Sequence, residues 1–254
     1  MTFVILTYNI IRKIYIEIIL EVNCVIKAND NEKLNYYISK YNLDEIFSID
    51  MKPHMELVMF NKNEHICKSG ETISYLFFLV HGKAKVYISL SNGKSLLLCF
   101  NKPLKVIGDV EFIKIDTADS NIQVIENAYC VVIPLEKIRQ YALDDSKFLR
   151  YISNSLGEKL TKISKYSSIN LLYPLENRLA SYLLATASSD NSEISGLTND
   201  CNLTEMSELL GTSYRHLLRT LNKLSDRGAI KKNKDIYEII DVRILEDFAG
   251  DLYE

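Results

Sequence analysis

Two arginines one helical turn apart, Arg215 and Arg219, are the residues of this sequence best suited to recognise another molecule. They follow the stretch "LLGTSY", in which Gly211 can form a tight turn with positive φ and Ser213 can cap the helix that starts after it. An arginine presents its N–H donors as a planar fork that matches phosphate oxygens or the edge of a guanine. The spacing therefore predicts a short helix with one face that reads anions or bases.

The other side of the same predicted helix is apolar. Leu217, Leu221 and Leu224 recur at steps of four and three, so they share one face. A preceding short helix, expected to start at Leu203, offers Ser207 as a small residue against which the second helix can pack closely. This pattern is typical of a helix-turn-helix, whose second helix enters the major groove of DNA. The alternative is an ordinary helical hairpin with a solvated basic face.

Positive charge is concentrated in this region, although the whole chain carries a net charge of -3. Between residues 212 and 234 the only acidic residue is Asp226, against seven lysines and arginines. After Gly228, "AIKKNKDIYEII" resembles two strands around a lysine-rich tip, as in the wing of a winged helix. The predicted DNA contacts are Thr212, Ser213, Tyr214, Arg215, His216, Arg219, Asn222, Lys223, Lys232 and Lys234.

A β-rich region must lie upstream of this unit. From about Leu57 to Ile133, short apolar runs such as "YLFFLV" and "SLLLCF" are separated by glycines and by the hairpin dipeptide Asn92-Gly93. This pattern predicts a compact antiparallel barrel or sandwich. The preceding segment, residues 29–47, has the spacing of a short amphipathic helix.

A long helix is predicted between the two units, in the region that Pro134 opens. Beyond Asp145, apolar residues recur at steps of three and four, and charged residues flank this narrow stripe. Such a stripe is typical of a coiled-coil seam and predicts dimerisation; the alternative is a helix packed on its own domain. The predicted seam consists of Leu149, Ile152, Leu156, Leu160 and Ile163.

The motifs "FLVHGKAKVYISLSNGKSLLL", "IGDVEFI", "PLENRLASYLL" and "LLGTSYRHLLRTLNKL" resemble the CRP/FNR superfamily of bacterial transcription regulators, and within it the YeiL-type regulators. The resemblance implies an α+β fold: an N-terminal cyclic-nucleotide-binding-like β-roll (jelly roll), a long dimerisation helix and a C-terminal winged helix-turn-helix. The corresponding domains are residues 29–134, 135–170 and 171–254, after an N-terminal extension of residues 1–28. The implied function is a homodimeric, sequence-specific regulator, activator or repressor, on a palindromic operator. Its partners would be double-stranded DNA, RNA polymerase and a small-molecule effector.

The resemblance places the base-reading positions of the family at Tyr214, Arg215 and Arg219. The commonest pattern in the family has an arginine followed by an acid, whereas this chain has Tyr214 followed by Arg215. The resemblance therefore leaves the preferred operator open, although it still implies DNA binding. Arg219 keeps the residue type of the family and is expected to contact a guanine.

The sensor departs further from the family. Cyclic-nucleotide binders of this fold hold the ribose with a Glu after a Gly and the phosphate with an Arg some ten residues later, and here no arginine lies between Arg12 and Arg139. A buried phosphate without a guanidinium would have a poorer partner, so cAMP is not expected. The corresponding effector-pocket positions are Gly108, Asp109, Ser120 and Asn121.

No cofactor is expected from the five cysteines, which are far apart and form no C-x-x-C pair. His65 and Cys67 would share one face of a strand, either as metal or haem ligands or as ordinary packing residues. Redox or metal sensing through Cys67, Cys99 or Cys130 is an alternative that no cluster spacing supports. An enzyme is not expected, because the sequence has no phosphate-binding glycine loop, H-E-x-x-H helix or nucleophile elbow.

The N-terminal extension, residues 1–28, is apolar, but its longest uncharged run is the eleven residues before Arg12, too short to cross a membrane. We therefore expect a cytoplasmic protein without a membrane partner. The extension would be a buried extra element or the product of a start codon placed too far upstream. Two other functions stay open: an orphan regulator that needs no ligand, and a protein-interaction module without DNA binding. Salt-dependent binding to duplex DNA separates the last from the others.

Overall fold

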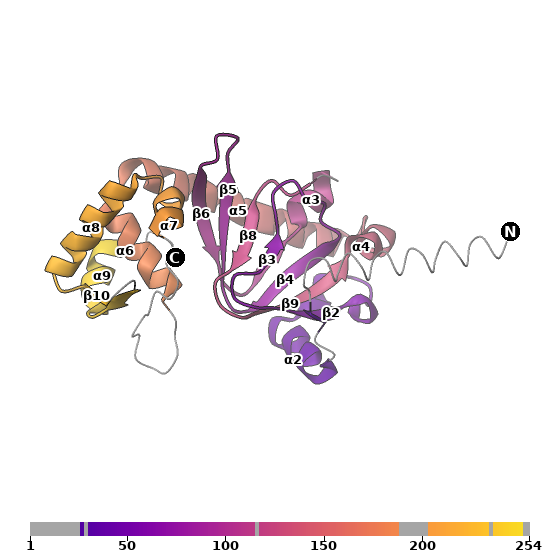
Figure 1. Ribbon diagram of the computed structural model, residues 1–254. Helices are drawn as coiled ribbons and strands as arrows, with labels where there is room; N and C mark the ends of the chain where they lie inside the picture. Colours follow the sequence, from indigo (N-terminus) through magenta and orange to yellow (C-terminus); the bar gives the residue numbers. More distant parts are fainter. Residues whose placement is uncertain (1–25, 28–29, 115–116, 188–202, 234–235, 251–254) are drawn as a thin grey trace.

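The structure is a computed structural model that describes residues 26–27, 30–114, 117–187, 203–233 and 236–250. It consists of an N-terminal β-roll and a smaller C-terminal unit, with the long helix α5 (Ser146–Leu172) running from one to the other (Figure 1). The predicted α+β fold class is confirmed. Residues 1–25 of the predicted N-terminal extension lie outside the described residues.

Two antiparallel sheets form the β-roll, and its buried side chains make one continuous core. The first sheet has the order β1 (Ile26–Lys27), β2 (Glu56–Phe60), β9 (Ala128–Pro134), β4 (Tyr75–His81), β7 (Lys105–Ile107). The second has the order β3 (His65–Cys67), β8 (Asn121–Val124), β5 (Ala84–Ser89), β6 (Ser95–Asn101). The predicted Asn92-Gly93 turn joins β5 to β6, and the Lys94 amide donates to Asn92 Oδ1.

Short helices surround the roll. Helix α2 (Asn31–Tyr41) is capped by Asp30, whose carboxylate accepts from the Lys33 amide, and it buries Tyr37 and Ile38. Short 3-10 turns follow at Leu43–Ile46 and Lys52–His54. Two further helices, α3 (Asp109–Lys114) and α4 (Leu135–Tyr141), follow strands β7 and β9 respectively.

The stretch 135–170, which we assigned to one dimerisation helix, contains two helices, α4 and α5. Asp145 starts the second one, because its carboxylate accepts from the amides of Lys147 and Phe148. The same carboxylate accepts from the amide and the hydroxyl of Ser48, at 2.6 and 2.7 Å. Asp145 thus caps α5 and ties its first turn to the roll.

Asp145→Ala is expected to lower the free energy of unfolding by about 1–2 kcal/mol at pH 7, the usual effect of losing an N-cap. Partial burial alone would raise the pKa of the Asp145 carboxyl, but the donors of Ser48, Lys147 and Phe148 outweigh burial and lower it. The contribution of a carboxyl with lowered pKa is complete above its unfolded-state pKa and lost as pH falls through the folded-state value. Urea unfolding should therefore show the difference at pH 7 and little difference near pH 2; an equal difference at both would contradict this role.

The C-terminal unit is a winged helix built around a second buried core. Its elements are α6 (Leu175–Thr186), α7 (Leu203–Leu209), α8 (Tyr214–Asp226), β10 (Ile230–Asn233), β11 (Ile236–Ile239) and α9 (Val242–Ala249). Four residues from outside the unit complete this core: Leu97 and Phe100 of β6, and Tyr166 and Ile169 of α5. The roll and the C-terminal unit are therefore packed against each other within one chain. Among the helices in the described ranges, none has the length and apolarity needed to cross a membrane.

Candidate nucleic-acid interface

Helix α8 follows α7 after a turn at Gly211, where φ is +61°. Ser213 caps α8: its Oγ accepts from the His216 amide at 3.2 Å. Leu217, Leu221 and Leu224 of α8 have no exposed surface and pack into the second core. The apolar stripe predicted from the sequence therefore fixes how α8 is rotated on the unit.

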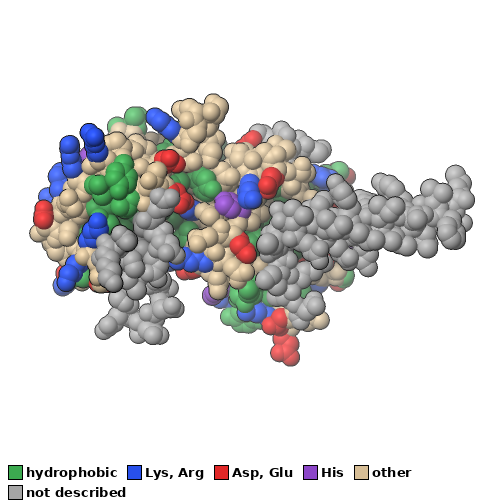
Figure 2. Space-filling model, in the orientation of Figure 1, with side chains coloured by type: hydrophobic (Ala, Val, Ile, Leu, Met, Phe, Trp, Pro, Cys, Tyr) green, Lys and Arg blue, Asp and Glu red, His purple; other side chains and the backbone are tan. Residues whose placement is uncertain are grey.

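The opposite face of α8 is exposed to solvent. The predicted contact residues on it are all exposed: Tyr214, Arg215, His216, Arg219, Asn222 and Lys223. Ser213 is exposed as well, and Thr212 is half-buried with its Oγ1 3.3 Å from Nδ1 of His216. Lys and Arg side chains gather at this end of the molecule, over α8 and the wing (Figure 2). The helix thus presents a cationic surface of the width that fits a major groove.

Lys223 has a partner within the protein. Its Nζ lies 2.6 Å from Oε1 of Glu176 at the start of α6, and this ammonium holds the pKa of the Glu176 carboxyl below its usual value. The Lys223 side chain is still 64% exposed. Among the predicted contacts on α8, Lys223 is the one whose charge is partly neutralised before any partner binds.

Strands β10 and β11 form the predicted wing, an antiparallel pair with Lys232 opposite Tyr237. The Lys232 ammonium lies 5.8 Å from the centre of the Tyr237 ring and is exposed. Lys234, the predicted contact at the tip, lies outside the described residues. Arg227 is a further exposed cation of this region that was not among the predicted contacts, and its guanidinium lies 4.7 Å from the centre of the Phe248 ring.

The structure divides the predicted dimer seam into two parts. Ile152 is 1% exposed and belongs to the core of the roll, and Leu149 and Leu156 pack against that core. Leu160 and Ile163 are 71% and 50% exposed. The first half of the stripe therefore packs on its own domain, which was our alternative interpretation, and only the second half is free for a partner.

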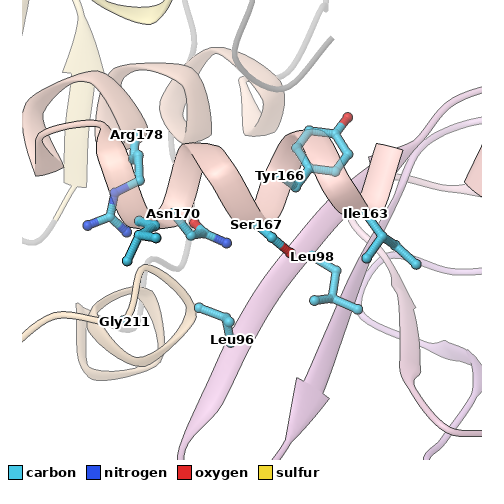
Figure 3. A pocket seen from close by; sticks show the side chains of 9 residues that line it. Leu96, Leu98, Ile163, Tyr166, Ser167, Asn170, Arg178 and Gly211 are labelled. Carbon is cyan, nitrogen blue, oxygen red and sulfur yellow. The ribbon is translucent and has the colours of Figure 1, made fainter. Parts of the chain in front are cut away.

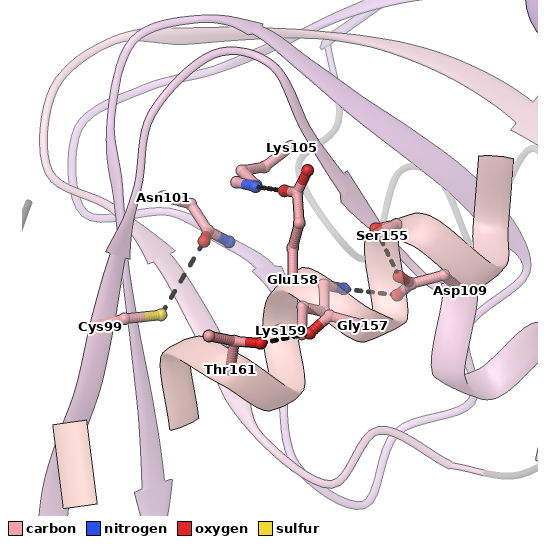
Figure 4. Close-up of polar contacts among 9 residues, drawn as sticks. All are labelled: Cys99, Asn101, Lys105, Asp109, Ser155, Gly157, Glu158, Lys159 and Thr161. Carbon is pink, nitrogen blue, oxygen red and sulfur yellow. Dashed lines mark hydrogen bonds and ion pairs between the residues drawn. The ribbon is translucent and has the colours of Figure 1, made fainter. Parts of the chain in front are cut away.

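The effector-pocket position Asp109 has no exposed surface and is occupied by partners from α5 (Figure 4). Oδ1 of Asp109 lies 2.5 Å from Nζ of Lys159, and Oδ2 accepts from the Ser155 hydroxyl at 3.0 Å. The preceding Gly108 is buried with φ of +96°. A second ion pair, between Lys105 and Glu158, also joins the roll to α5. The carboxylate that would hold a ligand sugar in the family thus holds the long helix.

The other effector-pocket positions are also used within the chain. Asn121 is 9% exposed, and its amide group bonds to the Ser69 amide and the Ser89 hydroxyl, while the Ser120 carbonyl accepts from the Cys67 thiol. Burial raises the pKa of the Glu111 carboxyl, and the carboxylates of Asp109 and Asp119 raise it further. Glu111 and Asp119 thus add carboxylates beside the Asp109–Lys159 pair, which disfavours a phosphate at this position.

Lys159→Met is expected to lower the free energy of unfolding by roughly 2–4 kcal/mol, because the buried Asp109 carboxylate would lose its cation. Lys162→Met is the matched control, since Lys162 lies on the same helix and has no ion pair in the described part of the chain. Adding Asp109→Asn to Lys159→Met should restore part of the loss. Urea unfolding of the four proteins measures this, and equal stability of Lys159→Met and Lys162→Met would contradict the role of the pair.

The candidate thiol and metal residues have separate partners. Nε2 of His65 lies 2.9 Å from the Tyr87 hydroxyl, whereas Cys67 is buried at an irregularity of β3. Burial raises the pKa of the Cys67 thiol to about 12 and raises that of the Cys99 and Cys130 thiols as well. Within the ranges that the structure describes, no three His, Cys, Asp or Glu residues gather as metal ligands. Thiols with raised pKa react slowly, which disfavours a redox switch at these positions.

One contact between the units has no signal in the sequence. Lys85 of β5 is 7% exposed, and its Nζ lies 2.5 Å from Oε1 of Glu205 on α7. Residues 120 positions apart thereby connect the roll to the first helix of the helix-turn-helix. This ion pair thus ties the helix-turn-helix to the roll through α7.

Comparisons with known proteins agree with this arrangement. The family model for the cyclic nucleotide-binding domain matches residues 57–145, and that for the Crp-like helix-turn-helix domain matches residues 177–248. Regulatory protein YeiL of Escherichia coli is 31% identical over 212 residues, which cover 84% of this chain and 94% of that protein. Two CRP or CRP/FNR-family regulators of Thermus thermophilus share the fold at a TM-score of 0.61 each. Their sequences are 19% and 16% identical to this one. The matches cover 77% and 78% of this chain, and 98% and 100% of the two Thermus proteins, respectively.

A sensor-like β-roll, a connecting helix and a Crp-like helix-turn-helix define a transcription regulator. The chain belongs to the CRP/FNR family of regulators, as its motifs predicted.

Proposed function

We propose that this regulator binds duplex DNA sequence-specifically through α8, with its wing on the adjacent backbone. The observation that carries the proposal is the contrast between the two faces of α8. Its three leucines are fully buried, and its polar face, with Arg215 and Arg219, is exposed. Arg219 would pair with a guanine, Arg215 and Tyr214 would read neighbouring bases, and Lys232 would contact phosphate. We further propose that the protein acts in the cytoplasm, where the DNA is, and that RNA polymerase is a further partner. We expect no catalytic activity.

The active form is proposed to be a homodimer on a palindromic operator. Leu160 and Ile163 leave an apolar stripe uncovered on α5, and a second copy of α5 would cover it. Two recognition helices related by a two-fold axis read half-sites about 34 Å apart, which requires a symmetric operator.

The roll is proposed not to bind cAMP. Lys159 and Ser155 occupy the Asp109 carboxylate, and the surrounding carboxylates would repel a phosphate. This arrangement also favours a second candidate: a regulator whose roll is held to α5 without any ligand in the roll. Both the proposal and this second candidate require that the roll does not bind cAMP. Calorimetric titration with cAMP should therefore show no heat of binding, and a saturable heat would contradict both.

Selection of bound duplexes from a random pool tests the proposed function directly. A palindromic consensus is expected, and its affinity should fall steeply with salt because lysine and arginine contacts release counterions. A protein-interaction module would select no sequence. Arg150→Ala is a suitable control for α8 variants, because Arg150 is an exposed arginine on α5, outside the C-terminal unit.

A further inference from the structure

A cavity of about 440 Å³ lies where the roll, α5 and the helix-turn-helix meet. Leu96 and Leu98 of β6 form one wall, and Ile163 and Leu171 of α5 form another. The turn residue Gly211, which precedes α8 in the sequence, also lines the cavity (Figure 3). The volume is in the range of sites that bind small molecules, and the walls are mostly apolar.

One cation, Arg178 of α6, lines this cavity beside Asn170 (Figure 3). Its Nη1 donates to the Leu210 carbonyl at 2.6 Å, which holds the guanidinium at the end of α7. Its Nε is buried and has no acceptor among the described residues, and no carboxylate of those residues pairs with the side chain. The positive charge of the guanidinium is therefore not neutralised by an ion pair within the described residues, and an anion in the cavity would be attracted to it.

We propose that this cavity binds an amphipathic monocarboxylate, with its carboxylate at Arg178 and its apolar body against Leu96 and Leu98 of β6, which lie outside the α5 stripe that a second copy would cover. A single guanidinium offers one positive charge, so a singly charged head matches it. A polyphosphate would place further negative charge against apolar walls, which disfavours a nucleotide. A carboxylate also matches the planar fork of arginine.

Binding at this place would affect α8, a step that rests on the proposed function. Gly211 is two residues before Ser213, the cap of α8, and α5 and β6 form the rest of the cavity. A ligand in contact with all three elements favours one relative position of the roll and the helix-turn-helix. It would therefore change the affinity for DNA, and DNA would change the affinity for the ligand by the same factor.

Octanoate is the probe for the binding test, measured by isothermal titration calorimetry on the full chain. We expect one octanoate per chain, with at least about tenfold weaker binding of octan-1-ol and octylammonium, which lack the carboxylate. Equal binding of all three compounds, or no binding of octanoate, would overturn the proposal.

Two variants locate the site. Ser167→Phe places a ring in the cavity and leaves Arg178 intact, whereas Ser168→Phe changes the neighbouring residue, which does not line the cavity. Arg178→Gln removes the charge and keeps a donor for the Leu210 carbonyl. Ser167→Phe and Arg178→Gln are each expected to weaken octanoate binding at least about tenfold, and Ser168→Phe should leave it unchanged. A loss in Ser168→Phe equal to that in Ser167→Phe would contradict this location.

The last measurement is the affinity for the selected duplex with and without saturating octanoate, which should differ at least about threefold. If the duplex binds tightly and octanoate has no effect on it, the regulatory inference fails and the proposed function stands. If octanoate binds but no duplex does, the proposed function fails and the ligand site stands. If Ser167→Phe converts dimers to monomers in light scattering and octanoate does not bind, a second copy of the chain covers the cavity and the inference is overturned.

Discussion

Arg219→Ala is expected to weaken binding to the selected operator by about 1–3 kcal/mol, or roughly 5- to 150-fold, and to relax the preference at one base pair of each half-site. Arg219 is exposed in the middle of α8, one turn beyond Arg215 and opposite the buried Leu217 and Leu221. Its side chain can therefore reach base edges without any change in the packing of the helix. Fluorescence anisotropy with the operator and with single-base variants measures the effect.

The controls for this prediction separate base reading from charge. Arg219→Lys keeps the positive charge but loses the fork, so it should recover the salt dependence of binding and not the base preference. Arg150→Ala removes an exposed arginine from α5 and should leave both unchanged. An unaltered base preference in Arg219→Ala would show that this residue does not read the operator.

Leu160→Asp is expected to convert the dimer into monomers of 29.2 kDa and to abolish tight binding to the palindromic operator. Leu160 is the most exposed residue of the predicted seam, at 71%, and a carboxylate there would be buried without a partner in a helix pair. A monomer holds only one half-site, so the gain from binding both half-sites together is lost. Light scattering coupled to size exclusion measures the mass.

Thr161→Asp is the matched control, because Thr161 is exposed on the next position of α5 and lies outside the apolar stripe. It adds the same charge to the same turn of the helix and should stay dimeric. A dimeric Leu160→Asp protein would show that the dimer forms elsewhere. Leu156, which the sequence also placed in the seam, is less suitable for this test because it packs against the core of the roll.

Local patterns in the sequence are sufficient for much of the fold. The Asn92-Gly93 turn, the Ser213 cap and the leucine stripe of α8 depend on neighbours within one or two turns, so their residue types predict their structure. The exposed face of α8 follows from the same periodicity. These are the features on which the family resemblance rests as well.

Contacts between distant elements could not be predicted. The pairing of Asp109 with Lys159 joins residues 50 positions apart, and neither residue has a local pattern that identifies its partner. The stripe on α5 is continuous in sequence, yet Ile152 faces the roll and Leu160 faces solvent, because the roll ends partway along the helix. The cavity at Arg178 likewise exists only because three separate elements meet there.

If the exposed basic face of α8 binds duplex DNA, the affinity of the full chain for its selected duplex must depend on salt and on the two arginines of that face. This affinity is measured as a function of salt for the wild type and for Arg215→Ala/Arg219→Ala. We expect a steep linear fall of log affinity with log salt for the wild type, with a slope near -0.9 per phosphate contact, and at least about a hundredfold loss of operator affinity in the double variant. Binding that is insensitive to salt, or equal in the two proteins, would show that α8 does not bind DNA through this face.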